Sequence, residues 1–304
     1  MKRTILATTA LVTCGSMAAA DVSLSGSAEV GVTGGSGGDA QIHRDARVKF
    51  TLSGETDTGL SFGTTLDFHN AGNYRAGGTS GAINISGVFG TLTIGDTDGA
   101  FDKAMLEVPA GTSIADDSTD HAGWSPGGNK GLDAGGEIVR YDYSIGDISL
   151  SLSTQNDDMN GDGADDDVAA AHGIGVGWSG EFAGASLGLG AGHQRSDMKN
   201  ISGASLSASL AGGLGFGVSM SRTSDSMGAD SSHAGAGLSY TLGDVSFAVN
   251  GGQNKTDGMP NKNGVGFAAS YSLGAGATFQ IGAGSSKEGD SSSNSWSAGI
   301  ALSF

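Results

Sequence analysis

The chain ends in Ser295-Trp296-Ser297-Ala298-Gly299-Ile300-Ala301-Leu302-Ser303-Phe304, and the alternation in this stretch decides the fold. Every even position is apolar, and every odd position is Ser, Gly or Ala. A period of two places the apolar side chains on one face of a β-strand and the small residues on the other. An edge strand this apolar promotes aggregation in a soluble protein, but it is stable where it closes a barrel whose outer face meets lipid. We therefore expect an all-β, antiparallel transmembrane barrel.

The first 20 residues have the pattern of a secretory signal peptide. Lys2 and Arg3 precede a short apolar run, and Ala18-Ala19-Ala20 forms a small-residue cleavage site. A segment of this length is too short for a membrane helix. We therefore expect cleavage after residues 1–20, and a single barrel domain over residues 21–304.

The only cysteine, Cys14, lies inside this leader. Leu11-Val12-Thr13-Cys14 also resembles a lipoprotein signal, although Thr13 is large for the position before the cysteine. If the leader is removed, the mature chain has no cysteine and forms no disulfide, even in an oxidising compartment.

Acidic residues dominate the composition. The chain has 32 Asp and Glu against 15 Lys and Arg, which gives a formal charge of −17 at pH 7. This surplus of negative charge argues against nucleic acid as a partner. No run of eighteen apolar residues follows the leader, so the sequence predicts no membrane helix. A membrane barrel needs apolar residues only at alternate positions.

Alternating segments recur along the whole chain, separated by turns rich in Gly and Asp. Short turns are expected on one side of the barrel and longer polar loops on the other, and an even number of strands puts both chain ends on the short-turn side. The sequence predicts sixteen strands, at residues 22–32, 43–54, 60–70, 82–86, 91–95, 136–144, 148–154, 170–179, 185–195, 202–211, 216–222, 234–241, 245–254, 264–272, 278–286 and 295–304.

One connection is much longer than the others. Residues 96–134 contain no alternating run, and structureless connections of that length are usually functional. The opening of this segment, Asp98 to Glu107, predicts one or two helical turns with Asp98 as the N-cap. Its body is acidic, with Lys103 as the only base before Trp124.

At this point the chain resembles the trimeric general porins of alphaproteobacteria, the Rhodobacter type. The resemblance implies sixteen strands, a homotrimer, and a third loop folded into the lumen to narrow a water-filled pore. It also implies passive diffusion of small hydrophilic solutes and ions, and a Gram-negative outer membrane with its lipid and lipopolysaccharide as surroundings. Phe304 matches the terminal signal that the barrel-assembly machinery reads. The stretches that carry the resemblance are Val22–Gly26, Phe50–Gly63 and Ser86–Asp96.

The resemblance also implies a constriction with carboxylates on the loop and bases on the opposite wall. Relatives usually have a denser arginine cluster, and a lumen as acidic as this one should favour cations. The simpler alternatives are ordinary lumen-facing charges and a solvated outer loop. The loop carboxylates would be Glu107, Asp116, Asp117 and Asp120, and the wall bases would be Arg47, Lys49 and Arg140.

A second acidic run suggests a calcium ligand set. Asp158, Asn160 and Asp162 alternate before Gly163, like the first half of a calcium-binding loop. Ala169 stands where such a loop needs a bidentate Glu, so we expect at most a looser oxygen cage, and the alternative is a solvated loop tip. No cofactor is required.

The sequence does not favour an enzyme. The six histidines are scattered without metal-ligand spacing, and no nucleophile elbow lies between a strand and a helix. Three other possibilities stay open. A substrate-specific channel would need a ladder of basic or aromatic residues along the lumen. A secreted or surface adhesin-like β protein would need a fixed repeat. The third is a mainly structural barrel.

Overall fold

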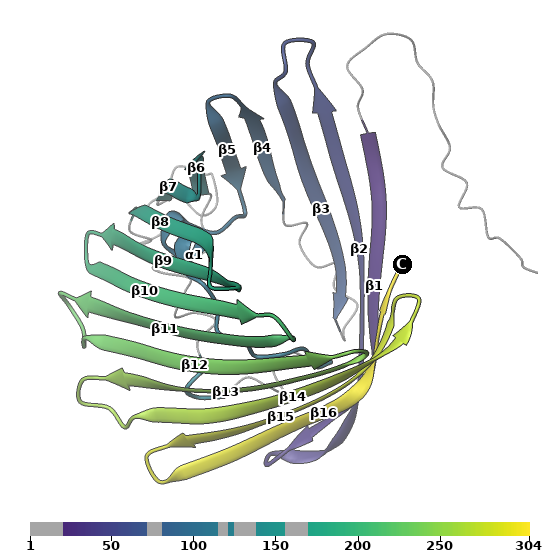
Figure 1. Ribbon diagram of the computed structural model, residues 1–304. Helices are drawn as coiled ribbons and strands as arrows, with labels where there is room; N and C mark the ends of the chain where they lie inside the picture. Colours follow the sequence, from purple (N-terminus) through teal and green to yellow (C-terminus); the bar gives the residue numbers. More distant parts are fainter. Residues whose placement is uncertain (1–20, 72–80, 115–120, 125–137, 156–169) are drawn as a thin grey trace, which may run out of the picture.

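The computed structural model describes residues 21–71, 81–114, 121–124, 138–155 and 170–304 of the chain. They form one closed barrel of antiparallel strands (Figure 1), in which each strand pairs with its neighbours in the sequence and β1 pairs with β16. This confirms the predicted fold class and the count of sixteen. The strands are β1 (Asp21–Gly35), β2 (Gly38–Glu55), β3 (Ser61–Ala71), β4 (Ala82–Gly87), β5 (Gly90–Gly95), β6 (Ile138–Ile145), β7 (Ile148–Gln155), β8 (Ala171–Phe182), β9 (Ala185–Ser196), β10 (Lys199–Leu210), β11 (Leu214–Asp225), β12 (Ser231–Leu242), β13 (Val245–Thr256), β14 (Lys262–Gly274), β15 (Ala277–Glu288) and β16 (Ser291–Ser303).

The last strand closes the barrel as its alternation predicts. Trp296 lies on the outer face and is 41% exposed, whereas the neighbouring Ser297 is 2% exposed. The terminal Phe304 continues the pairing beyond β16, because its N–H donates to the Gly26 carbonyl at 2.9 Å and its carbonyl accepts from Gly26 N–H at 3.3 Å. Pairing of residues 26–35 with residues 295–304 closes the sheet between the two ends of the chain, and closure of a sheet removes its exposed edges.

The outer face is apolar over most of its height. Outward side chains such as Leu24, Phe50 and Val249 are more than a third exposed, which is the expected state of side chains that meet lipid rather than water. Among the described residues no helix is long and apolar enough to cross a membrane.

The predicted ten-residue loop between the first two strands is wrong. β1 continues to Gly35 and β2 begins at Gly38, with a register irregularity between Thr33 and Gly35. The β9–β10 and β15–β16 connections are also two-residue turns where the sequence predicts longer loops. Polar residues complete an antiparallel ladder as well as apolar ones, because the ladder bonds are between backbone groups. Alternation of apolar residues therefore predicts strand ends that are too early at these connections.

The long connection between β5 and β6 is described over residues 96–114 and 121–124. It contains a short helix, α1 (Ala100–Ala104), which lies inside the curve of the barrel (Figure 1). The predicted N-cap is wrong: Gly99 occupies that position, without a side-chain cap hydrogen bond. Asp98 instead uses its backbone carbonyl to bind Arg140 of β6.

Candidate pore lining

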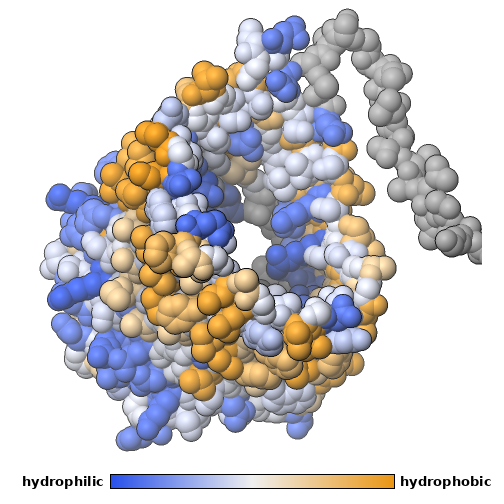
Figure 2. Space-filling view, viewed as in Figure 1, coloured by the Kyte–Doolittle hydropathy of each residue, from blue (hydrophilic) through white to orange (hydrophobic). Residues whose placement is uncertain are grey.

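A group of charged side chains, here called the charged wall, covers the lumen face of β1–β3. Asp45, Arg47 and Lys49 occupy alternate positions on one side of β2, and register pairing places Glu29 of β1 opposite Asp45 and Asp67 of β3 opposite Lys49. A hollow of about 870 Å³ lies against the part of this wall formed by Glu29, His43, Asp45, Arg47 and His69. Figure 2 shows an opening through the molecule with hydrophilic residues along the edge formed by these strands. The charged wall consists of Glu29, His43, Asp45, Arg47, Lys49, Asp67 and His69.

Every base and histidine of the charged wall has a carboxylate neighbour. Arg47 Nε lies 3.4 Å from Asp45 Oδ2, and Lys49 Nζ lies 3.7 Å from Asp67 Oδ2. His69 Nε2 contacts Asp45 at 2.8 Å. Register pairing explains the Lys49 contact, because Lys49 lies directly opposite Asp67 and such cross-strand pairs lie about 5 Å apart at Cβ. Arg47 and Asp45 are instead alternate residues of β2, and His69 lies opposite Arg47.

The fourth such contact is between His43 Nε2 and Glu29 Oε2, at 3.1 Å. The predicted wall bases Arg47 and Lys49 thus point into the lumen within a mixed network rather than as a free cluster of positive charge. Their role in a constriction stays a prediction.

Arg140 has a different environment from the other two predicted wall bases. Its side chain is buried at the base of the long connection, where Nε donates to Asp142 Oδ2 at 2.9 Å. Nη1 donates to Thr97 Oγ1 at 3.0 Å and to the Asp98 carbonyl. The guanidinium therefore fixes the point at which the connection leaves β5, and presents little charge to the open lumen.

The long connection begins by packing α1 against the inner face of β7–β9. The Ala100 N–H donates to Ser153 Oγ at 2.8 Å. The wall opposite the helix is glycine: a Cβ atom on Gly175 would lie 2.1 Å from the Ala100 carbonyl oxygen, and one on Gly190 would lie 2.0 Å from the Ala104 oxygen. Only a residue without a side chain allows the helix backbone to approach this closely.

The connection then follows the inner wall strand by strand. Leu106 N–H donates to Ser205 Oγ of β10 at 2.8 Å, and Pro109 lies against Gly217 of β11 and Gly237 of β12. We call this small-residue lumen face the docking wall. It consists of Ser153, Gly175, Gly190, Ser205, Gly217, Gly237, Ala248, Ala268, Gln280 and Gly299.

The first described segment of the connection ends at Ile114, which is fully buried. Its Cδ1 atom fills the space that side chains on Gly31 and Gly299 would need. Three residues earlier, Gly111 lies against Ala248 of β13 and Ala268 of β14. This part of the connection therefore spans the lumen face from β7 round to the join of β16 and β1.

Residues 121–124 lie against the wall again at β13–β15. His121 Nε2 lies 2.7 Å from Asn250 Oδ1, and Ala122 N–H donates to Ser286 Oγ at 2.8 Å. Asn254 Nδ2 donates to the Ala122 carbonyl at 2.9 Å. Burial lowers the pKa of His121 below its ordinary value, so this anchor is a neutral imidazole at pH 7.

The predicted acidic side of the constriction is only partly described. Glu107 is exposed, with its backbone oxygen beside Gly217. Asp116, Asp117 and Asp120 lie outside the described residues, as do Asp158, Asn160 and Asp162, so their pore and calcium roles stay predictions. No group of three His, Cys, Asp or Glu suited to a metal ion occurs in the described parts of the chain.

Comparison with known proteins identifies the family of the chain. The model of the Gram-negative porin family matches residues 7–291. The chain belongs to this family. A porin of Rhodobacter capsulatus is 32% identical over 162 residues, which are 51% of this chain and 53% of that protein. The chain thus matches about half the length of this curated relative.

The barrel is also similar to solved porin structures. A porin refined at 1.8 Å resolution has a TM-score of 0.73 at 21% identity and is covered completely by 93% of this chain. A triple mutant of Rhodopseudomonas blastica porin has a TM-score of 0.71 at 18% identity, with the same coverage. At this level of identity the likeness bears on the fold.

Sequence reasoning missed the docking wall. The glycines and serines of the later strands alternate with apolar residues, so the parity that predicts the lumen face was available. The segment that covers this face could not be predicted, because nothing in the composition of β8–β16 indicates that residues far away in the sequence lie against their inner faces.

Proposed function

We propose that this member of the Gram-negative porin family forms a water-filled channel for passive diffusion of small hydrophilic solutes and ions. The observation that carries the proposal is the division of the lumen face. The connection covers the docking wall, while the charged wall borders an opening in the barrel (Figure 2). Solutes would pass between the connection and the charged wall, and their size would be limited by the space between them.

The channel should favour cations. The carboxylates of the described strands all occupy lumen-facing positions, and each lumen-facing Lys or Arg of the strands lies within 4 Å of one of them. On the described strands ten such carboxylates stand against five lumen-facing Lys and Arg side chains, and a lumen lined by an excess of carboxylates attracts cations. These carboxylates are Asp21, Glu29, Asp39, Asp45, Glu55, Asp67, Asp142, Glu181, Asp225 and Glu288.

Family and fold place the chain in the outer membrane of a Gram-negative cell. We further propose export by a cleaved leader over residues 1–20, recognition of the Phe304-terminated strand by the barrel-assembly machinery, and assembly as a homotrimer in contact with outer-membrane lipid and lipopolysaccharide. No chemical step is needed for diffusion, so we propose no enzymatic activity.

Single-channel recording in a planar bilayer tests this function. The refolded mature chain should give large conductance steps in groups of three, and a KCl gradient should give a reversal potential of the sign that indicates cation preference. A barrel whose heat-modifiable migration shows correct folding, but which gives no conductance, would contradict the open channel. A reversal potential of the opposite sign would contradict the cation preference alone.

A further inference from the structure

Charge is segregated between the two faces of the barrel wall. Strand carboxylates point to the lumen, and no described strand residue with a carboxylate lies at an outward position. Cations divide between the faces. The lumen-facing ones each pair with a carboxylate, whereas the outward ones project from the outer surface. The outward cations of the strands are Arg44, Arg195, Arg222, Lys255 and Lys287.

Four of these cations lie near one rim on the outside of β9–β15 and are here called the cationic row: Arg195, Arg222, Lys255 and Lys287. Strand register places Arg222 and Lys255 at one level, because Ser232 lies opposite both, and Ser202 lies opposite Arg222 on its other side. Arg195 and Lys287 are each offset from this level by two residues, because their partners Asn200 and Asn263 lie opposite Ser224 and Gln253.

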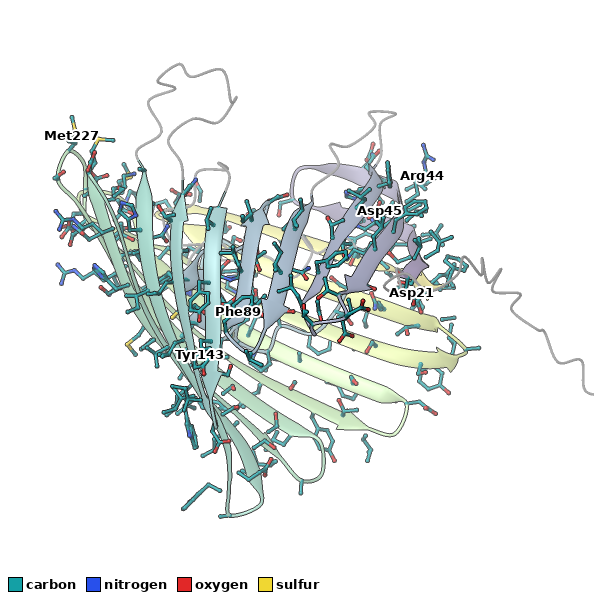
Figure 3. All side chains as sticks on the ribbon, turned by 90° about the horizontal axis from the view of Figure 1, so that it is seen from above. Asp21, Arg44, Asp45, Phe89, Tyr143 and Met227 are labelled. Carbon is teal, nitrogen blue, oxygen red and sulfur yellow. The ribbon has the colours of Figure 1, made fainter. Side chains whose placement is uncertain are left out.

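One further side chain extends the row beyond β9, and another lies within it on β14. His172 of β8 lies opposite Arg195, and Asn263 of β14 lies opposite Lys287. Figure 3 shows nitrogen-bearing side chains projecting from the outer wall on the side of Met227, which lies in the β11–β12 turn at the rim away from the chain ends. Only Arg222 has an acidic partner among the described residues, Asp230 at 3.4 Å, and this pair is largely exposed.

An apolar groove lies directly below the row. Arg222, Ser232 and Lys255 border an outer hollow of about 490 Å³ whose floor includes Met220 and Ala234. Further down the same strands, a second outer hollow of about 680 Å³ is lined by Phe216, Leu238, Val249, Val265 and Phe267. One patch of the outer wall thus combines cations and hydroxyls near the rim with these two apolar hollows beneath them, here called the trough.

We propose that this patch binds lipopolysaccharide of the outer leaflet, with the anionic head on Arg222 and Lys255 and the acyl chains in the trough beneath. The inference rests on the proposed function for its orientation, since short-turn ends of such barrels face the periplasm and the opposite rim faces outward. Charge complementarity selects the occupant. In a chain with a formal charge of −17, an outward row made only of cations and neutral polar groups suits phosphate and carboxylate, which Lys and Arg bind strongly.

Titration of the folded full chain in detergent with diphosphorylated lipid A, read by native mass spectrometry, tests the site. Arg222→Ser with Lys255→Ser should weaken binding on the order of tenfold, given the typical contribution of each cation at an anionic lipid surface. Higher salt should weaken binding to the wild-type protein more than to this variant. Arg47→Ser with Lys49→Ser removes the same charge from the lumen face and should leave lipid A affinity unchanged.

Equal weakening by the two double variants would overturn the proposal, because net charge alone would then explain binding. No weakening by Arg222→Ser with Lys255→Ser would also overturn it. Phosphatidylglycerol is the competing anionic lipid, and equal affinity for it with the same loss in the variant would overturn the assignment to lipopolysaccharide. Conductance of the outer double variant should match that of the wild type. A wild-type barrel that binds lipid A through these residues but does not conduct would contradict the channel and leave the lipid site standing.

Discussion

The charged wall and the docking wall are lumen faces of one barrel, yet they are built from opposite kinds of residue. β1–β3 present long polar side chains, such as Arg47 and Glu29, to a hollow. Where the connection from elsewhere in the chain lies against β7–β16, these strands present mostly Gly, Ser and Ala, and the connection approaches them at backbone distance. The difference teaches that side-chain size on the inner face decides which part of the wall holds the connection and which part borders the pore.

This comparison explains the glycine content of the later strands. Glycine within a strand lacks a side chain to pack and weakens the strand, so its repetition at lumen positions requires a compensating contact. The compensation is visible at Gly175 and Gly190, where helix carbonyls occupy the space of the missing side chains. On the charged wall the lumen positions instead carry long polar side chains that face the hollow.

The largest effect is expected where the connection leaves the wall. Arg140→Ala leaves Asp142 without its guanidinium at a site where Arg140 is 7% exposed. Removing one partner of a buried pair typically costs about 3–5 kcal/mol, so urea unfolding in detergent should show a loss of this order. Because the start of the connection also loses its anchor, single-channel current should become noisier.

A surface pair provides the matched control for that change. Lys262 lies 3.4 Å from Glu288, and both side chains are about half exposed. Lys262→Ala should cost less than about 1 kcal/mol, because exposed ion pairs contribute little. Similar losses in the two variants would show that Arg140 does not hold the connection.

The docking wall itself can be broken by one methyl group. Gly190→Ala places a Cβ atom 2.0 Å from the Ala104 carbonyl oxygen, so α1 must move or the wall must shift. Overpacking of this kind typically costs about 1–3 kcal/mol, and displacement of the connection should change the conductance. Gly38→Ala introduces the same atom into open space and should change neither quantity; equal effects would refute the size rule for the docking wall.

The charged wall should respond in selectivity rather than in stability. Arg47→Ser with Lys49→Ser removes two half-exposed cations and leaves Asp45 and Asp67 in the lumen. Loss of these exposed pairs should cost about 1 kcal/mol or less each, while the reversal potential in a KCl gradient should shift toward stronger cation preference. An unchanged reversal potential would show that ions do not pass along this wall.

Much of the barrel could be predicted because alternation is a local property. The strand count and the parity of Arg47 and Lys49 followed from a period of two, which is legible in any single strand. The docking of Ile114 between Gly31 and Gly299 could not be predicted, because it joins three segments far apart in the sequence. The role of Arg140 was equally hidden: parity places it on the lumen face, but only the path of the connection brings Thr97 and Asp98 to its guanidinium.

The smallest expected effect concerns the return of the connection to the docking wall, and it depends on pH. His121 donates from Nε2 to Asn250 Oδ1, and its Nδ1 atom is buried without a hydrogen-bond partner. Burial lowers its pKa below the ordinary 6.5. The unfolded chain therefore takes up the proton first, so the anchor contributes fully above pH 6.5 and loses strength as the pH falls below it.

Protease cleavage within the connection, followed from pH 8 to pH 5, measures the strength of this anchor. Cleavage of the wild-type protein should rise below pH 6.5, because a protonated imidazole would bury a second N–H without a partner. His121→Gln keeps a donor for Asn250 but cannot titrate, so its cleavage should not vary with the ionisation of this site. His193→Gln, on the outer face, should behave like the wild type. If His121→Gln keeps the full pH dependence, titration of His121 does not govern the return of the connection to the wall. That return then rests on packing against glycine and on neutral hydrogen bonds such as the one from Ala122 N–H to Ser286 Oγ.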